Sequence, residues 1–354
     1  MTTPKQRIAF IDALRGFTMI LVVYSHIQFF GYQYTDFFNL TFIKFRMPLF
    51  FFISGFVLYK KERIWDYSTS ISFLVNKFKV QIISTLIFFC LYIYVFNKGL
   101  YHSVGELKAG YWFTYTLFFY YLFYVCSIFL SKLLRNDRYE DAIVIMVAIA
   151  VFLLCCFTLM DKTHGHQRLI GVIGIPKWSY YVFFIFGTLV KKYYKAFLSI
   201  LDNSLIMALI ICAFFLLLIF DPAKETDSFR PVSFLLYGFM GVVIIFSVFK
   251  KNEEWFATDR HVSQWLQYIG RHTLDIYLLH YFFLPYHLEC IGQFFKDYPS
   301  HTIELFISTC ISLMVISISL LVSKVLCTSP LLGEVLFGKK SRPRHLMPET
   351  ESRK

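Results

Sequence analysis

Long apolar runs, separated by short polar segments, repeat along almost the whole chain. Each run spans roughly 17–25 residues, the length of helix that crosses the ~30 Å hydrocarbon layer of a bilayer. Helices are favoured because a segment crossing lipid must satisfy its own backbone hydrogen bonds. The pattern predicts an all-α, polytopic membrane bundle with about ten transmembrane helices. The runs lie near residues 8–30, 42–60, 79–97, 111–131, 141–160, 178–194, 203–220, 231–249, 273–291 and 302–324.

Basic residues are divided unevenly among the polar segments. Every second segment is rich in Lys and Arg, and the clearest example is Lys191, Lys192 and Lys195, directly after the sixth run. Cytoplasmic loops carry such an excess, so both termini are expected to be cytoplasmic and the number of spans even. Residues 1–337 are expected to form one transmembrane domain. The polar residues 338–354 are expected to form a disordered cytoplasmic tail.

The composition agrees with a bilayer environment and excludes several other classes of protein. Hydrophobic residues make up 57% of the chain and charged residues only 16%, against about 25% in soluble domains. The net charge of +12 is attributed to topology and to anionic lipid of the bilayer, not to nucleic acid, because no basic stripe accompanies a soluble fold. Most of the eight cysteines lie inside apolar runs and no CxxC pair occurs, so we interpret them as buried small hydrophobes.

The first apolar run contains three ionisable residues, which are expensive inside a bilayer and mark functional sites by default. Arg15 and His26 are eleven residues apart, which places them on nearly the same helix face, about 16 Å apart along the axis. Asp12, Met19 and Val22 lie on or near that face. This stripe predicts a surface that faces protein or water. Two structural readings stay open: Asp12 and Arg15 as a pair near the inner surface, and His26 as a packing histidine.

The second run begins near Lys44 and contains a proline, a Ser-Gly pair and one arginine of interest. Pro48 suits the first turn of a helix, where its missing N–H costs nothing. Ser54 and Gly55 are small and favour close approach of another helix. Arg46 lies near the expected outer end, where it could line a site.

The ninth run contains Asp275, Tyr277, His280 and His287. His280 and His287 are seven residues apart and would share a helix face, but that spacing is too long for both to bind one metal ion easily. No HExxH or Walker A sequence occurs in the chain. We therefore expect no metal site and no permanently bound cofactor.

Four segments, in this order, resemble acyltransferase family 3, the membrane-embedded acyltransferases that modify cell-surface glycans and related molecules. They are RIAFIDALRGFTMILVVYSH at 7–26, MPLFFFISGFVLYKK at 47–61, YWFTYTLFFYYLFY at 111–124 and YIGRHTLDIYLLH at 268–280. The resemblance implies a multi-pass protein of the inner (plasma) membrane. It also implies transfer of an acyl group, usually acetyl from acetyl-CoA, to a hydroxyl.

The family's essential histidine matches His26, and its basic partner matches Arg15. One departure concerns a basic RxxR pattern, usually followed by Pro, that leads into the third span in the family. Here the stretch reads FLVNKFKVQIIS, with Val80 and Ser84 where Arg and Pro are expected. Because of this departure, the resemblance alone does not identify the residues that contact the donor's phosphates.

The chemistry of acyl transfer then assigns roles to candidate residues. A hydroxyl needs a base, for which histidine is suited, and the phosphates of acyl-CoA need cations. The acyl group could also be held first on His26 or Ser54 in a two-step relay. The predicted catalytic residues are His26, Arg15 and Asp12. The predicted donor-binding residues are Arg15, Lys60, Lys61, Lys77 and Lys79, although the lysines could serve topology alone. The predicted acceptor-binding residues are Arg46, Ser54, Trp112, Tyr277 and His280.

Two alternatives remain open at the level of sequence. The first is a membrane transporter of a small acid or a glycan intermediate, which would also carry charges within its spans. The second concerns the acceptor, which could be a surface polysaccharide, a lipid-linked sugar, peptidoglycan or a small glycoside.

Overall fold

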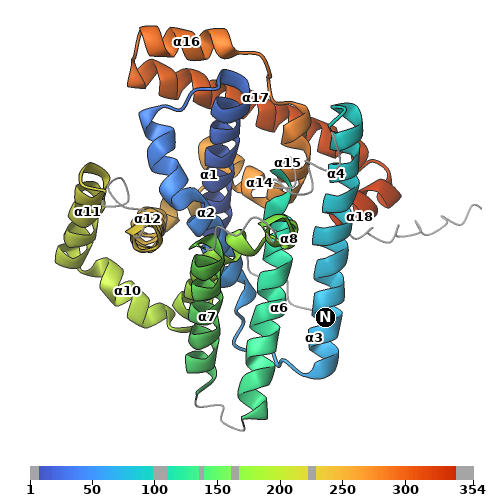
Figure 1. Ribbon diagram of the computed structural model, residues 1–354, viewed down its shortest axis with the longest axis vertical. Helices are drawn as coiled ribbons and strands as arrows, with labels where there is room; N and C mark the ends of the chain where they lie inside the picture. Colours follow the sequence, from blue (N-terminus) through green and yellow to red (C-terminus); the bar gives the residue numbers. More distant parts are fainter. Residues whose placement is uncertain (1–7, 99–109, 135–138, 161–166, 222–228, 340–354) are drawn as a thin grey trace, which may run out of the picture.

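The computed structural model describes residues 8–98, 110–134, 139–160, 167–221 and 229–339 (Figure 1). Within these ranges all regular elements are helices and no strand occurs. The N-terminal half contains α1 (Ala9–His26), η1 (Ile27–Tyr32), α2 (Phe37–Leu58), α3 (Tyr67–Lys77), η2 (Phe78–Ile83), α4 (Ser84–Val95), α6 (Trp112–Leu133), α7 (Glu140–Met160) and α8 (Gln167–Ile173). The remaining elements are η5 (Ile175–Tyr180), α9 (Tyr181–Lys192), α10 (Tyr194–Asp202), α11 (Ser204–Ile219), α12 (Arg230–Lys251), α13 (Glu253–Ala257), α14 (His261–Arg271), α15 (Thr273–Leu279), η8 (His280–Phe282), α16 (Glu289–Asp297), α17 (His301–Leu326) and α18 (Pro330–Phe337).

Seven helical segments of the described chain are long and apolar enough to cross a membrane, and an eighth is possible if α10 and α11, bent by 79°, form one span. The helical membrane architecture is therefore confirmed, but the expected count of about ten spans is not. The side of the bilayer on which each terminus lies stays a prediction. The seven segments are Ala9–Tyr32, Phe37–Leu58, Tyr67–Val95, Trp112–Leu133, Glu140–Thr158, Arg230–Lys251 and His301–Leu326.

The ninth apolar run does not form the continuous helix expected over 273–291. Helical structure ends at Phe282 and resumes only at Glu289, because Pro285 lacks a backbone N–H and cannot continue the helical hydrogen bonding. The break leaves His280 fully buried, whereas His287 is 92% exposed and has a positive φ of 66°. These two histidines therefore do not share a face, and that prediction was wrong.

Helix α2 begins earlier than the sequence suggested. The carboxylate of Asp36 caps it by accepting a hydrogen bond from the backbone N–H of Asn39 at 2.6 Å, which satisfies an end group that the helix itself cannot pair. Pro48 consequently lies in the interior of α2 and not in its first turn.

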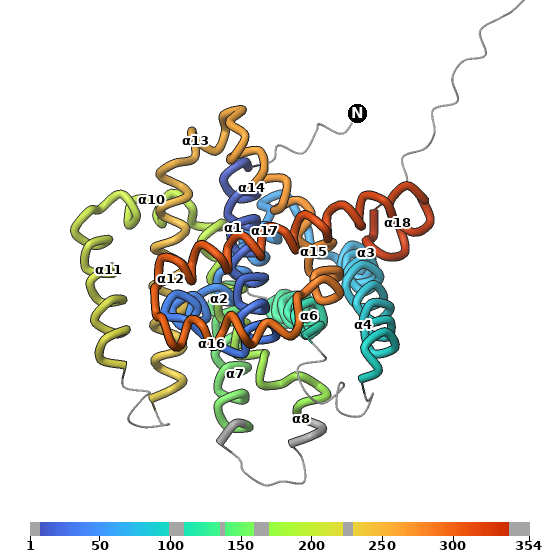
Figure 2. Tube along the Cα trace, turned by 90° about the horizontal axis from the view of Figure 1, so that it is seen from above, coloured from blue at the N-terminus to red at the C-terminus, as the bar shows by residue number. Residues whose placement is uncertain are grey.

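Two glycine pairs hold the centre of the bundle together. A Cβ on Gly55 of α2 would lie 1.9 Å from the carbonyl oxygen of Phe184 in α9, and a Cβ on Gly187 would lie 2.0 Å from that of Phe52. The close helix approach expected at Gly55 is thus confirmed. Similar contacts join α1 to α14, through Gly16 and Gly270. Helix α1 also contacts α2 and α17, and it lies near the centre of Figure 2.

The chain returns to the bundle at its C-terminal end. Lys339 forms an ion pair with the buried carboxylate of Asp275 in α15, and Ser323 of α17 donates to the same carboxylate at 2.5 Å. Gly338 and Lys339 belong to the expected polar tail; its residues from 340 to 354 lie outside the described chain.

Candidate active site

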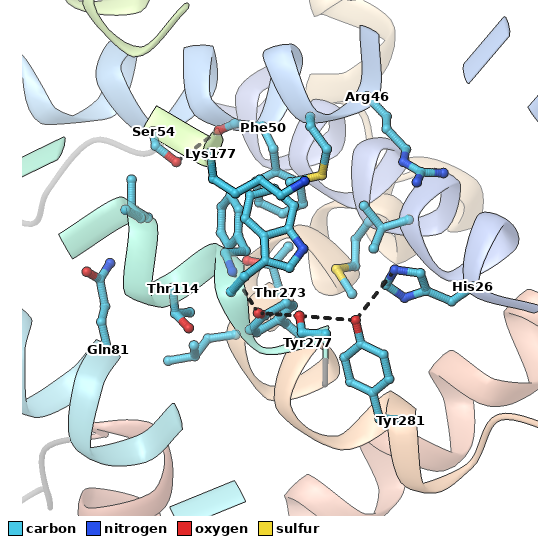
Figure 3. Close-up of a pocket in the computed structure, with 18 of the residues that line it drawn as sticks. His26, Arg46, Phe50, Ser54, Gln81, Thr114, Lys177, Thr273, Tyr277 and Tyr281 are labelled. Atoms are coloured by element: carbon cyan, nitrogen blue, oxygen red, sulfur yellow. Dashed lines mark hydrogen bonds between the residues drawn. The ribbon is translucent and has the colours of Figure 1, made fainter. Parts of the chain in front are cut away.

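One cavity of about 990 Å³ lies inside the bundle, between α1, α2, η2, α6, η5 and α15 (Figure 3). Two π-helical segments border it: η1 follows His26 directly, and η2 contributes Val80 and Gln81 to the wall. Such widened turns recur at functional sites because they shift side chains out of α-helical register. The polar lining residues are Arg15, His26, Arg46, Ser54, Lys77, Gln81, Tyr92, Lys98, Trp112, Thr114, Tyr121, Lys177, Tyr180, Thr273, Tyr277, Tyr281 and Tyr286.

One face of α1 forms a wall of the cavity. Arg15, Met19, Val22 and His26 all line it, as the periodicity of the first apolar run predicts. Asp12, one turn before Arg15, is half-buried, does not line the cavity and lies close enough to interact electrostatically with Arg15. The α1 wall therefore runs from a guanidinium at one end to an imidazole about 16 Å away at the other.

A second histidine holds His26 in place from behind. The Nδ1 atom of His26 lies 2.8 Å from Nε2 of His280, and the two rings are nearly parallel with their centroids 5.1 Å apart. The Nδ1 atom of His280 lies 2.9 Å from the carbonyl oxygens of Ile276 and Tyr277. Because carbonyl oxygens only accept hydrogen bonds, His280 must carry its proton on Nδ1.

These contacts fix the tautomer of His26 when both rings are neutral. His280 has its proton on Nδ1, so its Nε2 has a lone pair and can only accept. His26 must then donate from Nδ1, which leaves its own Nε2 without a proton. That Nε2 faces the cavity side, 3.5 Å from the hydroxyl of Tyr281.

The hydroxyl of Tyr281 has a closer partner than His26. It donates to the carbonyl oxygen of Gly110 at 3.2 Å, and the hydroxyl of Tyr277 donates to the same oxygen at 3.0 Å. Tyr277 in turn accepts from the backbone N–H of Phe113 at 3.1 Å. Tyr281 can thus donate its proton to the carbonyl oxygen of Gly110, and the lone pair on Nε2 of His26 can then accept a proton from a bound molecule.

The charged side chains that line the cavity are all cationic. They are Arg15, Arg46, Lys77, Lys98 and Lys177, and no Asp or Glu of the described residues joins them. At one end, Arg15 donates to Thr273 Oγ1 at 3.0 Å, and the ammonium of Lys77 lies 4.6 Å from the ring centroid of Tyr121. A cavity of this kind favours anionic ligands.

The other cationic end lies near His26. Arg46 is 9% exposed and its Nη1 donates to Asn39 Oδ1 at 3.3 Å. The ammonium of Lys177 lies 4.9 Å from the ring centroid of Trp112. Burial lowers the pKa of Lys177 below the ordinary lysine value, and the nearby charge of Arg46 lowers it further.

The structure brings some of the predicted site residues together and leaves others apart. His280 does not line the cavity but lies fully buried behind His26, and the side chains of Lys60, Lys61 and Lys79 are exposed and outside it. Those that line the cavity are Arg15, His26, Arg46, Ser54, Lys77, Trp112 and Tyr277. The described residues contain no group of three or more His, Cys, Asp or Glu that could hold a metal ion.

Sequence reasoning missed several lining residues. Lys177, in the short helix η5, resembles a loop lysine placed before an apolar run. Gln81 and Thr273 are single polar residues next to apolar runs, and Tyr281 is one of 24 tyrosines. For these four, sequence offers no signal that separates a lining residue from a packing one.

Comparison with known proteins identifies the family of this chain. The model of acyltransferase family 3, described as an acyltransferase domain, matches residues 8–323. No curated protein and no solved structure matches the chain.

Proposed function

This chain belongs to acyltransferase family 3 and is a multi-pass membrane protein. From this we propose that it transfers an acetyl group from acetyl-CoA to a hydroxyl group. The acceptor is a glycan or glycolipid. The observation that carries the proposal is the contact of His26 Nδ1 with His280, from which we infer that the Nε2 of His26, on the cavity side, has no proton.

The proposed step uses His26 as a general base and then as a general acid. The hydroxyl oxygen of the acceptor attacks the thioester carbon while Nε2 takes the hydroxyl proton. The C–S bond then breaks, the same proton passes to the leaving sulfur, and free CoA and an ester remain. His280 is a positioning residue in this scheme, because it holds the tautomer and the ring orientation of His26 without touching the substrate.

The donor fits along the α1 wall. Arg15 and Lys77 at one end supply cations for the phosphates of acyl-CoA. The rise between Arg15 and His26, about 16 Å, is close to the roughly 15–20 Å of an extended pantetheine arm. A donor anchored at Arg15 therefore brings its thioester to His26.

The test measures release of the CoA thiol by the purified protein in detergent, with acetyl-CoA as donor and a methyl hexoside as acceptor. His26→Gln is expected to lower kcat at least ~100-fold, the usual contribution of a general base. His287→Gln, at an exposed histidine, serves as the control and is expected to keep the wild-type rate. Near wild-type transfer by His26→Gln would refute the assignment. Solute movement by the protein reconstituted in vesicles, without thiol release, would favour the transporter.

A relay through an acyl-enzyme makes a separate prediction. If the acyl group rests first on Ser54 or His26, labelled acetyl-CoA without acceptor will label the protein, and Ser54→Ala will remove the label in the first case. Direct transfer leaves the protein unlabelled.

A further inference from the structure

Two cations at the His26 end of the cavity have no anionic counterpart in the described part of the chain. Arg46 comes from α2 and Lys177 from η5, and both line the cavity. No carboxylate of the described residues lies within ion-pair distance of either one. Figure 3 shows Arg46 above His26, and Lys177 beside Phe50 with its ammonium end pointing toward the Arg46 side of the view.

The buried carboxylate of Asp36, which is linked to Arg46 through Asn39, already has hydrogen-bond partners. Asp36 accepts hydrogen bonds from Tyr24, from the side-chain amide of Gln28 at 2.6 Å and from the backbone N–H of Asn39. Asn39 in turn accepts from Ser25 and from Arg46. Asp36 thus fixes the position of Arg46 through Asn39, but it does not form an ion pair with Arg46 and so does not neutralise its charge.

Two like charges brought together in a buried site are unfavourable unless an anion joins them. The oxyanion of a tetrahedral intermediate exists only during the reaction, so it would not offset this repulsion in the resting complex. A stable anion bound between Arg46 and Lys177 would do so. Arg46 offers a planar fork suited to carboxylate or phosphate, and Lys177 offers a point charge.

The phosphates of the donor do not account for this pair. In the proposed function they bind near Arg15 and Lys77, about 16 Å from His26 along α1. An acetyl group is uncharged. The anion at the His26 end must therefore come from the molecule that presents its hydroxyl to His26.

We propose that Arg46 and Lys177 bind a carboxylate or phosphate substituent of the acceptor, so that the acceptor is an acidic glycan or a phosphorylated one. This proposal rests on the proposed function. It adds the substrate class: the hydroxyl that is acylated belongs to a molecule that carries a negative charge close to that hydroxyl.

The experiment compares three acceptors with acetyl-CoA as donor: a methyl hexuronoside, a hexose phosphate and the matching neutral methyl hexoside. The wild-type protein is expected to prefer at least one charged acceptor over the neutral one in kcat/KM. Lys177→Gln is expected to reduce that preference at least ~10-fold through KM, the size of one charged hydrogen bond. Lys195→Gln, at an exposed lysine outside the cavity, should leave the preference unchanged.

Two other origins of the charge requirement give different results. If the pair stabilises the oxyanion, Lys177→Gln will lower kcat equally for charged and neutral acceptors. If it binds a dicarboxylic acyl group, the protein will prefer succinyl-CoA over acetyl-CoA with the neutral acceptor, and Lys177→Gln will abolish that preference. Either result overturns the proposal, as does an equal preference for charged and neutral acceptors by the wild type.

A binding measurement separates this proposal from the proposed function. Ligand-observed NMR with the methyl hexuronoside and the hexose phosphate can be performed on the His26→Gln variant, which does not need to turn over. Binding of one of them that Lys177→Gln weakens at least ~10-fold supports the anion site even if acyl transfer is not observed. Transfer without such binding would overturn the anion site alone.

Discussion

Replacing His280 tests the claim that one histidine positions the other. His280→Phe keeps a buried ring but removes the acceptor for the Nδ1–H of His26, which lies 2.8 Å away. His280→Gln keeps an acceptor oxygen at about the same reach. If His280 acts only through His26, the first variant should lower kcat with little change in KM, and the second should restore most of the rate.

The magnitude follows from how the contact changes during the reaction. In the resting protein the two neutral rings share a hydrogen bond worth about 1 kcal/mol, and in the transition state His26 becomes cationic and the bond is worth about 2 kcal/mol. Only this difference of about 1 kcal/mol speeds the chemical step. Loss of a fixed tautomer and ring orientation adds about 1 kcal/mol. The sum of about 2 kcal/mol corresponds to roughly a 30-fold fall in kcat.

The assay is initial-rate release of the CoA thiol, with thermal unfolding in detergent as the control for folding. We expect His280→Phe to lose roughly 30-fold in kcat and His280→Gln less than about 5-fold. Positioning by His280 is refuted if His280→Phe stays within twofold of the wild-type kcat. It is equally refuted if both variants fall together with their melting temperatures, because that pattern reports only a loss of packing.

Three further predictions concern packing, the donor and pH. Gly55→Ala places a methyl group 1.9 Å from a backbone carbonyl and should destabilise the protein by at least about 2 kcal/mol in thermal unfolding, whereas Gly333→Ala, whose Cβ would meet its nearest atom at 3.7 Å, should have little effect. Lys77→Gln should raise KM for acetyl-CoA about tenfold, and Lys79→Gln, outside the cavity, should raise it much less; equal effects would contradict the donor site. Burial and the charge of Arg46 lower the pKa of Lys177, so Lys177 should lose its charge at a lower pH than an ordinary lysine. The preference for an acidic acceptor should therefore fall as pH rises through that range, and Lys177→Arg should keep the preference. A preference that does not depend on pH in either protein would contradict this.

The apolar runs of the sequence predict the long spanning helices but not the short ones. Hydropathy measures how readily a segment leaves water, and it cannot tell lipid from protein as the new environment. The run at 178–194 therefore looked like a full span, although its α-helix, α9, covers only Tyr181–Lys192 and packs against α2 and α7. The ninth run contains Pro285, which breaks the helix, but the length of the apolar pattern favours a continuous helix over 273–291.

The sequence predicts contacts within one helix of the site, but not contacts between residues that are far apart along the chain. Helix periodicity alone places Arg15 and His26 on one face, because both belong to one helix. The partnership of His26 with His280 joins residues 254 positions apart, and nothing in their spacing along the chain reveals it. Charge alone also fails to rank the lysines: Lys60 and Lys77 are equally basic in sequence, but only Lys77 lines the cavity.

A neutral partner for His26 is consistent with the proposal that the cavity binds anions at both ends. Many catalytic histidines are held by a carboxylate, which also stabilises the imidazolium that forms. A carboxylate at the position of His280 Nε2 would place a fixed negative charge directly behind His26 and would make that end of the cavity less favourable for an anionic acceptor. Histidine provides the same hydrogen-bond geometry without a charge, because its Nδ1 proton is held by two carbonyl oxygens of α15. His280→Glu, whose carboxylate reaches about as far as the Nε2 of histidine, should therefore orient His26 but weaken the preference for a charged acceptor. The values of kcat/KM for the charged and neutral acceptors, measured on that variant, decide whether the neutrality of His280 matters.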